Sequence, residues 1–155
     1  MMSVIVGISD CKVSKDAQCA LVTYALGSCI AVAMHDPAAG IAGLLHFMLP
    51  EASMDPAKAA ANPFMFADTG IPELVRRMIA LGADKRKLNV RIAGGAQVVS
   101  GPGLFQIGRR NSLAARQMLS KQGLPLSAET VGGDVSRTVR IEVATGLTTI
   151  REIGH

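Results

Sequence analysis

The sequence predicts a strand-rich α/β domain of the α+β type, with a mixed or antiparallel β core that is flanked by helices. Short apolar and β-branched runs follow one another through the first 50 residues. Two segments of helical spacing come next, and strand patterns return towards the C-terminus. Consecutive strands favour antiparallel pairing over a doubly wound parallel sheet. The chain has 155 residues, 49% of them apolar, and shows no internal repeat, so residues 1–155 are expected to form a single domain.

Helices are predicted over residues 70–81 and 111–122, because apolar side chains recur there three or four residues apart and a glycine follows each segment. Asp68 or Thr69 is expected to cap the first helix, and Asn111 or Ser112 the second. The connection 50–63 is expected to be mobile with one weak helical turn, and residues 98–108 to form a loop. Strands are expected over residues 4–8, 11–13, 20–24, 30–34, 41–49, 88–93, 126–131, 138–144 and 147–153.

The charge is modest overall and unevenly distributed. The net charge is +4, but residues 1–75 carry three lysines against seven acidic residues, whereas residues 76–155 carry thirteen lysines and arginines against five. The basic half can attract an anionic partner, although its cations stand in separate small groups that equally suit a solvated surface. Aromatic residues make up only 3% of the chain, which argues against nucleic-acid binding by base stacking.

Three cysteines, Cys11, Cys19 and Cys29, form no CxxC pair, and their odd number argues against a disulfide scaffold. The N-terminus lacks the basic segment of a signal peptide, and no apolar run reaches the roughly 18 residues of a membrane-spanning helix. We therefore expect a soluble, cytoplasmic protein without membrane insertion.

Residues 26–50 predict a β-hairpin that brings a cysteine to a histidine. If the loop is the four residues 36–39, Cys29 lies directly opposite His46 in the antiparallel ladder, with the two Cβ atoms about 4.5–5.5 Å apart. A five-residue loop would place the two side chains on opposite faces of the hairpin. The expected meeting therefore depends on the register.

A cysteine beside a histidine has the chemistry of a thiol nucleophile. The imidazole of His46 can take the proton of the Cys29 thiol, whose ordinary pKa is about 8.5, and leave a nucleophilic thiolate. Thr23 can orient the imidazole as a third member. Gly27 permits a sharp corner, and the amide N–H groups near Cys29 can receive an oxyanion. Ser28 can donate to substrate or brace the turn.

The same residues allow plainer interpretations. Free cysteine is often buried as a small apolar residue, and a histidine in an apolar run can be a core residue with its hydrogen bonds satisfied. Cys11 and Cys19 are expected to be structural, and His35, next to the turn, to be exposed. A zinc site built from Cys29, His46 and a second cysteine matches no common ligand spacing, so no metal is expected.

Together these segments resemble the chemoreceptor glutamine deamidase family, CheD. The resemblance rests on Leu26-Gly27-Ser28-Cys29, on Asp36-Pro37 with Gly40, and on His46-Phe47-Met48-Leu49-Pro50. It continues through Gly94-Gly95-Ala96 and Ile107-Gly108-Arg109-Arg110-Asn111 to Gly132-Gly133, Arg137 and Thr145-Gly146. One departure is Tyr24-Ala25, where the family often has a leucine-glycine pair, and it is expected to alter the entrance to the site.

The resemblance implies a sandwich-like fold similar to the deamidating toxins, among them the catalytic domain of cytotoxic necrotizing factor. It implies hydrolysis of selected glutamine side chains to glutamate on the cytoplasmic domain of methyl-accepting chemotaxis receptors, with release of ammonia and with no metal or organic cofactor. The family's nucleophile, histidine and threonine fall on Cys29, His46 and Thr23. A CheC-type phosphatase is a further implied partner.

Alternatives remain open for one residue and for the function. Asn111, together with Gly27 and Ser28, is a candidate for contact with the substrate or the oxyanion, but it equally suits a brace or a helix cap. The chain is either a deamidase, a module that regulates a CheC-type phosphatase without turnover, or another cysteine hydrolase such as a receptor methylesterase. The presence of all three of the proposed catalytic residues favours the enzyme.

Overall fold

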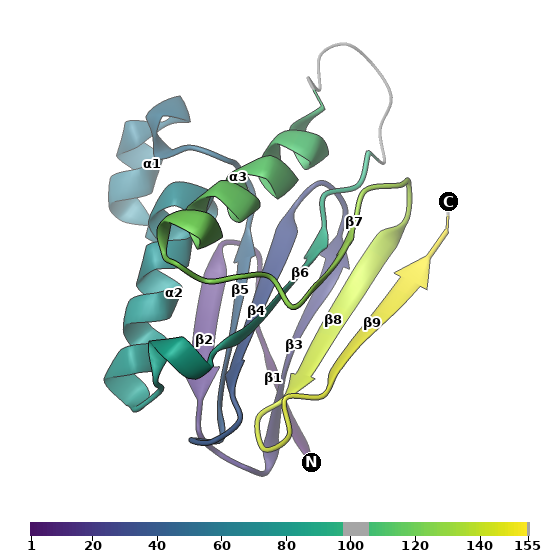
Figure 1. The fold of residues 1–155 in the computed structure, drawn as a ribbon. Coiled ribbons are helices and arrows are strands. Elements are labelled where there is room, and N and C mark those ends of the chain that lie inside the picture. The colour runs from purple at the N-terminus through teal and green to yellow at the C-terminus, as the bar shows by residue number, and fades with distance from the viewer. Residues whose placement is uncertain (98–105, 155) are drawn as a thin grey trace.

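The computed structural model describes residues 1–97 and 106–154, and in these ranges two β-sheets are covered on one side by helices (Figure 1). The strand orders are β1-β3-β8-β9 and β2-β5-β4-β6-β7. The helices pack against the five-stranded sheet, so the molecule has three layers. The strands are β1 (Met2–Ile5), β2 (Asp10–Ser14), β3 (Cys19–Leu26), β4 (Ile30–Asp36), β5 (Ile41–Phe47), β6 (Asn89–Gly94), β7 (Ala128–Val131), β8 (Ser136–Glu142) and β9 (Thr148–Ile153), and the α-helices are α1 (Pro56–Ala61), α2 (Ala67–Leu81) and α3 (Ile107–Lys121).

The architecture agrees with the predicted mixed α/β class, and both sheets are mixed. β1 pairs with β3 and β6 with β7 in parallel, and the other pairs are antiparallel. The parallel β6–β7 pair requires a crossover, which α3 supplies. As a result the N-terminal half of α3 lies over the ends of β4 and β6 (Figure 1).

β4 and β5 are buried over their whole length, because both faces of the five-stranded sheet are covered. Ile30 packs against the helices, whereas Ala31 and Leu44 face the four-stranded sheet. Since side chains alternate along a strand, Cys29 and His46 belong to the face that points towards the four-stranded sheet. The space between the two sheets therefore receives both reactive side chains.

The hairpin register differs from the prediction by two residues. Asp36 still belongs to β4 and Ala31 pairs with His46, so the four-residue loop begins at Pro37 and Cys29 is not directly opposite His46. Asp36 stays in the strand because its buried carboxylate accepts hydrogen bonds from two N–H groups of the loop. A shift of two keeps every side chain on its face. Cys29 and His46 are therefore diagonal neighbours on one face.

Both long helices begin earlier than predicted. α2 starts at Ala67, because Asp68 lies within the first turn and its carboxylate accepts a hydrogen bond from the N–H of Ala52 instead of capping the helix. α3 starts at Ile107, so the predicted cap Asn111 lies inside the helix. The C-terminal ends lie within one residue of the prediction, next to the glycines that follow.

The structure also describes all of the predicted connection 50–63 and part of the predicted loop 98–108. The connection 50–63 contains the six-residue helix α1. Most of the predicted loop 98–108 lies outside the described residues, and its described end forms the first residues of α3. In the described ranges, no helix is long and apolar enough to cross a membrane.

Candidate active site

The three residues predicted for catalysis lie at one end of the space between the sheets. Thr23 is on β3 in the four-stranded sheet, His46 is on β5 in the five-stranded sheet, and Cys29 comes directly before β4. Thr23 and His46 are buried, and Cys29 is half-buried. The fold thus brings Thr23 to His46 across the gap between the two sheets. Cys29 lies just before the strand adjacent to β5, on the same face of the five-stranded sheet as His46.

A hydrogen bond joins Thr23 to His46. Thr23 Oγ1 is 2.7 Å from His46 Nδ1 and 2.8 Å from the carbonyl oxygen of Val6. A hydroxyl has one proton and a carbonyl can only accept, so Thr23 donates to Val6 and accepts from the Nδ1–H of His46. The imidazole is therefore held in the tautomer whose Nε2 carries no proton. Nε2 is then available as a general base.

Burial sets the protonation state of both reactive groups. It lowers the pKa of His46 to about 4. It raises the pKa of Cys29, an effect that the cysteine's own backbone N–H partly offsets. Nε2 of His46 is buried and has no hydrogen-bond partner among the described residues. Near neutral pH the site therefore holds a neutral thiol and an unused neutral base, rather than a preformed thiolate–imidazolium pair.

The corner that carries Cys29 is held through its carbonyl groups. The N–H of Gly95 donates to the carbonyl of Cys29, and the N–H of Ala96 donates to the carbonyl of Gly27, each at 2.9 Å. The carbonyl of Ser28 accepts one of 2.9 Å from the side chain of Asn111. In contrast, no N–H group of residues 27–29 donates to another described residue. Free N–H groups beside a nucleophile are suited to an oxyanion.

Asn111 is a buried brace within α3. Its amide nitrogen donates to the carbonyl oxygens of Ser28 at 2.9 Å and Met48 at 2.8 Å. One side chain thus ties together the strand ends that carry Cys29 and His46. Both of its N–H groups are used, and the residue is fully buried. These contacts support the bracing role and oppose the predicted contact of Asn111 with an oxyanion or with a receptor surface.

Arg137 belongs to the surroundings of the site, and its strand pattern could have indicated this. Val139 and Ile141 face inward from β8, so the alternation of the strand puts Arg137 inward as well. Its guanidinium is buried, pairs with Glu152 at 2.8 Å and donates to the carbonyl of Gly94 at 3.0 Å. Arg137 therefore joins the four-stranded sheet to the end of β6, next to the corner.

The two residues that depart from the family pattern form a bulge in β3. Ala25 has a φ of 58°, a conformation that favours glycine, and the pairing with β8 is irregular there. Tyr24 is exposed and lines a hollow on the outer face of the four-stranded sheet. Thr23 points to the opposite, inner face. The predicted effect of Tyr24 on the entrance is therefore not supported by its position.

The other two cysteines lie away from the site. Cys11 packs in the core between the five-stranded sheet and the helices, and burial raises its pKa to about 12. The thiol of Cys19 donates to the carboxylate of Asp16 at 3.3 Å. Within residues 1–97 and 106–154, no three His, Cys, Asp or Glu side chains are grouped so that they could hold a metal ion.

A thiol, an imidazole with a fixed tautomer and a hydroxyl that fixes it form the kind of site found in cysteine-dependent hydrolases. The chain belongs to the CheD family, as predicted. Residues 48–152 match the family model described as CheD chemotactic sensory transduction. That match begins after Thr23, Cys29 and His46, but similarity to whole relatives extends over these residues as well.

Two relatives and one solved structure illustrate the similarity. A Solibacter usitatus protein named probable chemoreceptor glutamine deamidase CheD is 48% identical over 154 residues, which cover 99% of this chain and 91% of the relative. A Syntrophus aciditrophicus protein named probable chemoreceptor glutamine deamidase CheD 1 is 47% identical over 154 residues, covering 99% and 96%. The crystal structure of a Neisseria meningitidis protein of the DUF152 family shares the fold with a TM-score of 0.53 and 11% identity, covering 86% of this chain and 63% of that one.

Proposed function

We propose that this chain hydrolyses the side-chain amide of selected glutamines on the cytoplasmic domain of methyl-accepting chemotaxis receptors, producing glutamate and ammonia. The observation that carries the proposal is the Thr23–His46 hydrogen bond, which leaves Nε2 unprotonated on the sheet face that Cys29 shares. The names of the relatives supply the class of substrate. The reaction is amide hydrolysis through a thioester.

The first half of the reaction joins the substrate to Cys29. The sulfur attacks the carbonyl carbon of the glutamine side chain while the thiol proton passes to Nε2 of His46, because burial keeps the thiol protonated until a base removes its proton. The carbonyl oxygen becomes an oxyanion and accepts hydrogen bonds from the free N–H groups of residues 27–29. The intermediate then expels its nitrogen, which takes the proton from Nε2 and leaves as ammonia.

The second half releases glutamate. Nε2 of His46 takes a proton from a water molecule, whose oxygen attacks the thioester carbonyl. The carbon–sulfur bond then breaks, and the Cys29 sulfur recovers its proton from Nε2. In both halves the Nδ1–H of His46 stays bonded to Thr23, which keeps the ring oriented and stabilises its positive charge. Every bond change uses the cysteine, the histidine, the substrate or water.

The test is incubation of a receptor cytoplasmic fragment with the wild-type chain and with Cys29→Ala, followed by mass spectrometry and ammonia measurement. We expect a gain of about 1 Da and one ammonia per modified glutamine with the wild type, and neither with the variant. Thermal unfolding of both proteins checks that the variant is folded. Methanol released from a methylated receptor in place of ammonia would instead identify a methylesterase. No product from either substrate would favour a non-catalytic module that binds a CheC-type phosphatase.

A further inference from the structure

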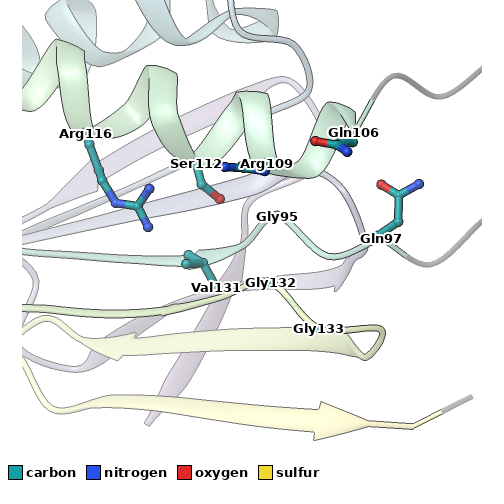
Figure 2. A pocket seen from close by; sticks show the side chains of 9 residues that line it. All are labelled: Gly95, Gln97, Gln106, Arg109, Ser112, Arg116, Val131, Gly132 and Gly133. Atoms are coloured by element: carbon teal, nitrogen blue, oxygen red, sulfur yellow. The ribbon is translucent and has the colours of Figure 1, made fainter.

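A cavity of about 490 Å³ lies beside the corner of Cys29, between α3 and the segments that follow β6 and β7 (Figure 2). Arg109, Ser112 and Arg116 line it from α3, where spacings of three and four residues place them on one side of the helix. The backbones of Gly95 and Gly132 line the opposite wall. The reaction described above uses none of these side chains.

The cavity shares a wall with the proposed active site. Gly95 lines the cavity, and its N–H donates to the carbonyl of Cys29 at 2.9 Å. On the helix side, Ser112 follows Asn111, whose amide binds the carbonyl of Ser28. The cavity and the nucleophile are therefore neighbours across one stretch of backbone. The thiol faces the four-stranded sheet and the cavity faces α3, so a protein segment reaches both where it crosses this end of the five-stranded sheet.

The charge of the cavity is positive and is carried by one residue. Two arginines and no acidic residue line it among the described residues. Arg116 is paired through two hydrogen bonds, of 2.9 and 3.0 Å, with the carboxylate of Glu129. Arg109 has no ion pair or hydrogen bond with any described residue. The guanidinium of Arg109 is thus the uncompensated charge of the cavity.

We infer that this cavity binds an aspartate or glutamate side chain of the substrate protein, close in its sequence to the target glutamine. The inference rests on the proposed deamidase function. A carboxylate can accept two parallel hydrogen bonds from one guanidinium. Because Arg109 is exposed, such a pair contributes modestly, and it acts through selectivity rather than through tight binding. The cavity then selects among the glutamines of a receptor those that have an acidic neighbour.

Arg110 provides a matched control. It adjoins Arg109 and is exposed, but it does not line the cavity. Arg109→Glu and Arg110→Glu change the net charge of the chain equally, so a general electrostatic effect would appear in both. Only Arg109→Glu reverses the charge inside the cavity. Because both side chains are exposed, neither substitution disturbs the core.

The experiment uses synthetic peptides with one central glutamine and a single glutamate, methionine or lysine at each nearby position in turn. Ammonia release gives kcat/KM for each peptide with the wild type and the two variants. Binding of the same peptides is measured on Cys29→Ala. At one position or more, we expect the wild type to prefer glutamate over methionine by roughly two- to fivefold. We expect Arg109→Glu to lose this preference and to favour lysine, and Arg110→Glu to keep the wild-type order.

The outcomes separate the cavity from the reaction. Equal rates for the glutamate and methionine peptides at every position, or a glutamate preference that persists in Arg109→Glu, would overturn the inference and leave the deamidase function standing. If no peptide and no receptor fragment releases ammonia, the proposed function fails. Binding of the peptides to Cys29→Ala then tests separately whether the cavity binds an acidic side chain. Equal binding of acidic and neutral peptides would then reject it, and tighter binding of the acidic peptides would support it.

Discussion

Thr23 has one hydroxyl proton, and its neighbours decide where that proton lies. The carbonyl of Val6 can only accept a hydrogen bond, so it fixes the hydroxyl as a donor on that side and as an acceptor from His46 on the other. A threonine can therefore take the place of the aspartate or asparagine that usually orients a catalytic imidazole. The threonine adds no negative charge, which agrees with the lowered pKa of His46.

This arrangement predicts that two substitutions of Thr23 differ in their effect on kcat/KM. Thr23→Val keeps the shape but removes the acceptor for Nδ1–H, so we expect kcat/KM to fall roughly 10- to 100-fold, the cost of one hydrogen bond to a group that becomes charged during the reaction. Thr23→Ser keeps the hydroxyl and should stay within a few-fold of wild type. Ammonia release from a receptor fragment measures both. Full activity in Thr23→Val, or an equally large loss in Thr23→Ser, would contradict the role assigned to the hydroxyl.

The end of β6 and the N-terminal half of α3 together position the corner of Cys29. Gly94 ends β6 with a φ of +112°, and a Cβ added there would lie 2.2 Å from the carbonyl oxygen of Cys29. Asn111 holds the preceding carbonyl from the helix side. The position of Cys29 therefore depends on two elements that lie far from it in the sequence.

Gly94→Ala tests this dependence, with Gly123→Ala as its control. Gly123 also has a positive φ, +72°, but no atom lies within 4 Å of an added Cβ. We expect Gly123→Ala to cost about 1–2 kcal/mol of unfolding free energy and to leave the activity unchanged. Gly94→Ala should cost about 1–3 kcal/mol more, through the clash, and should lower kcat up to about 100-fold by displacing Cys29. Urea unfolding and ammonia release measure the two effects, and full activity in a folded Gly94→Ala protein would contradict this account.

The elements also show what sequence patterns can and cannot predict. The alternating pattern of β4 and β5 is sufficient to place Cys29 and His46 on one face of the sheet. A register shift of two residues leaves each side chain on the same face. The register itself depends on hydrogen bonds from the loop to the buried carboxylate of Asp36. Such a contact has no periodic signature. The predicted start of α3 is wrong for a related reason. Asparagine is a typical capping residue, but Asn111 lies inside the helix and its side chain donates to two distant carbonyls.

Tertiary packing also explains the wrong prediction for His35. This residue adjoins a turn in the sequence, but the turn between β8 and β9 covers it, and its Nε2 is 2.9 Å from the carbonyl of Val143. Gly146 of that turn lies against the imidazole ring, where an added Cβ would come within 2.4 Å. The sequence indicates the glycine turn, but only the packing of one sheet on the other brings it to His35.

For the molecule as a whole, the packing of the two sheets makes the free energy of unfolding depend on pH. His46 is enclosed between the sheets, where its pKa of about 4 lies well below the ordinary value of about 6.5. Above pH 6.5 the imidazole is neutral in the folded and the unfolded chain, so it contributes no pH dependence. Below pH 6.5 the unfolded chain binds a proton that the folded chain excludes. The free energy of unfolding should therefore decrease as the pH falls from about 6.5 to about 4.

The expected loss is at most about 3 kcal/mol, because each pKa unit corresponds to about 1.4 kcal/mol. The measurement is urea unfolding between pH 7.5 and pH 4 for the wild type and for His46→Gln, which has no titrating group at this position. Carboxylates such as Glu73, whose pKa Arg76 holds at about 2, titrate alike in both proteins and cancel in the difference. We expect the wild type to lose stability more steeply than His46→Gln below pH 6.5, and the difference to level off near pH 4. Parallel curves would show that His46 has the same pKa in the folded and the unfolded chain, which would contradict the effect of burial between the sheets on its protonation.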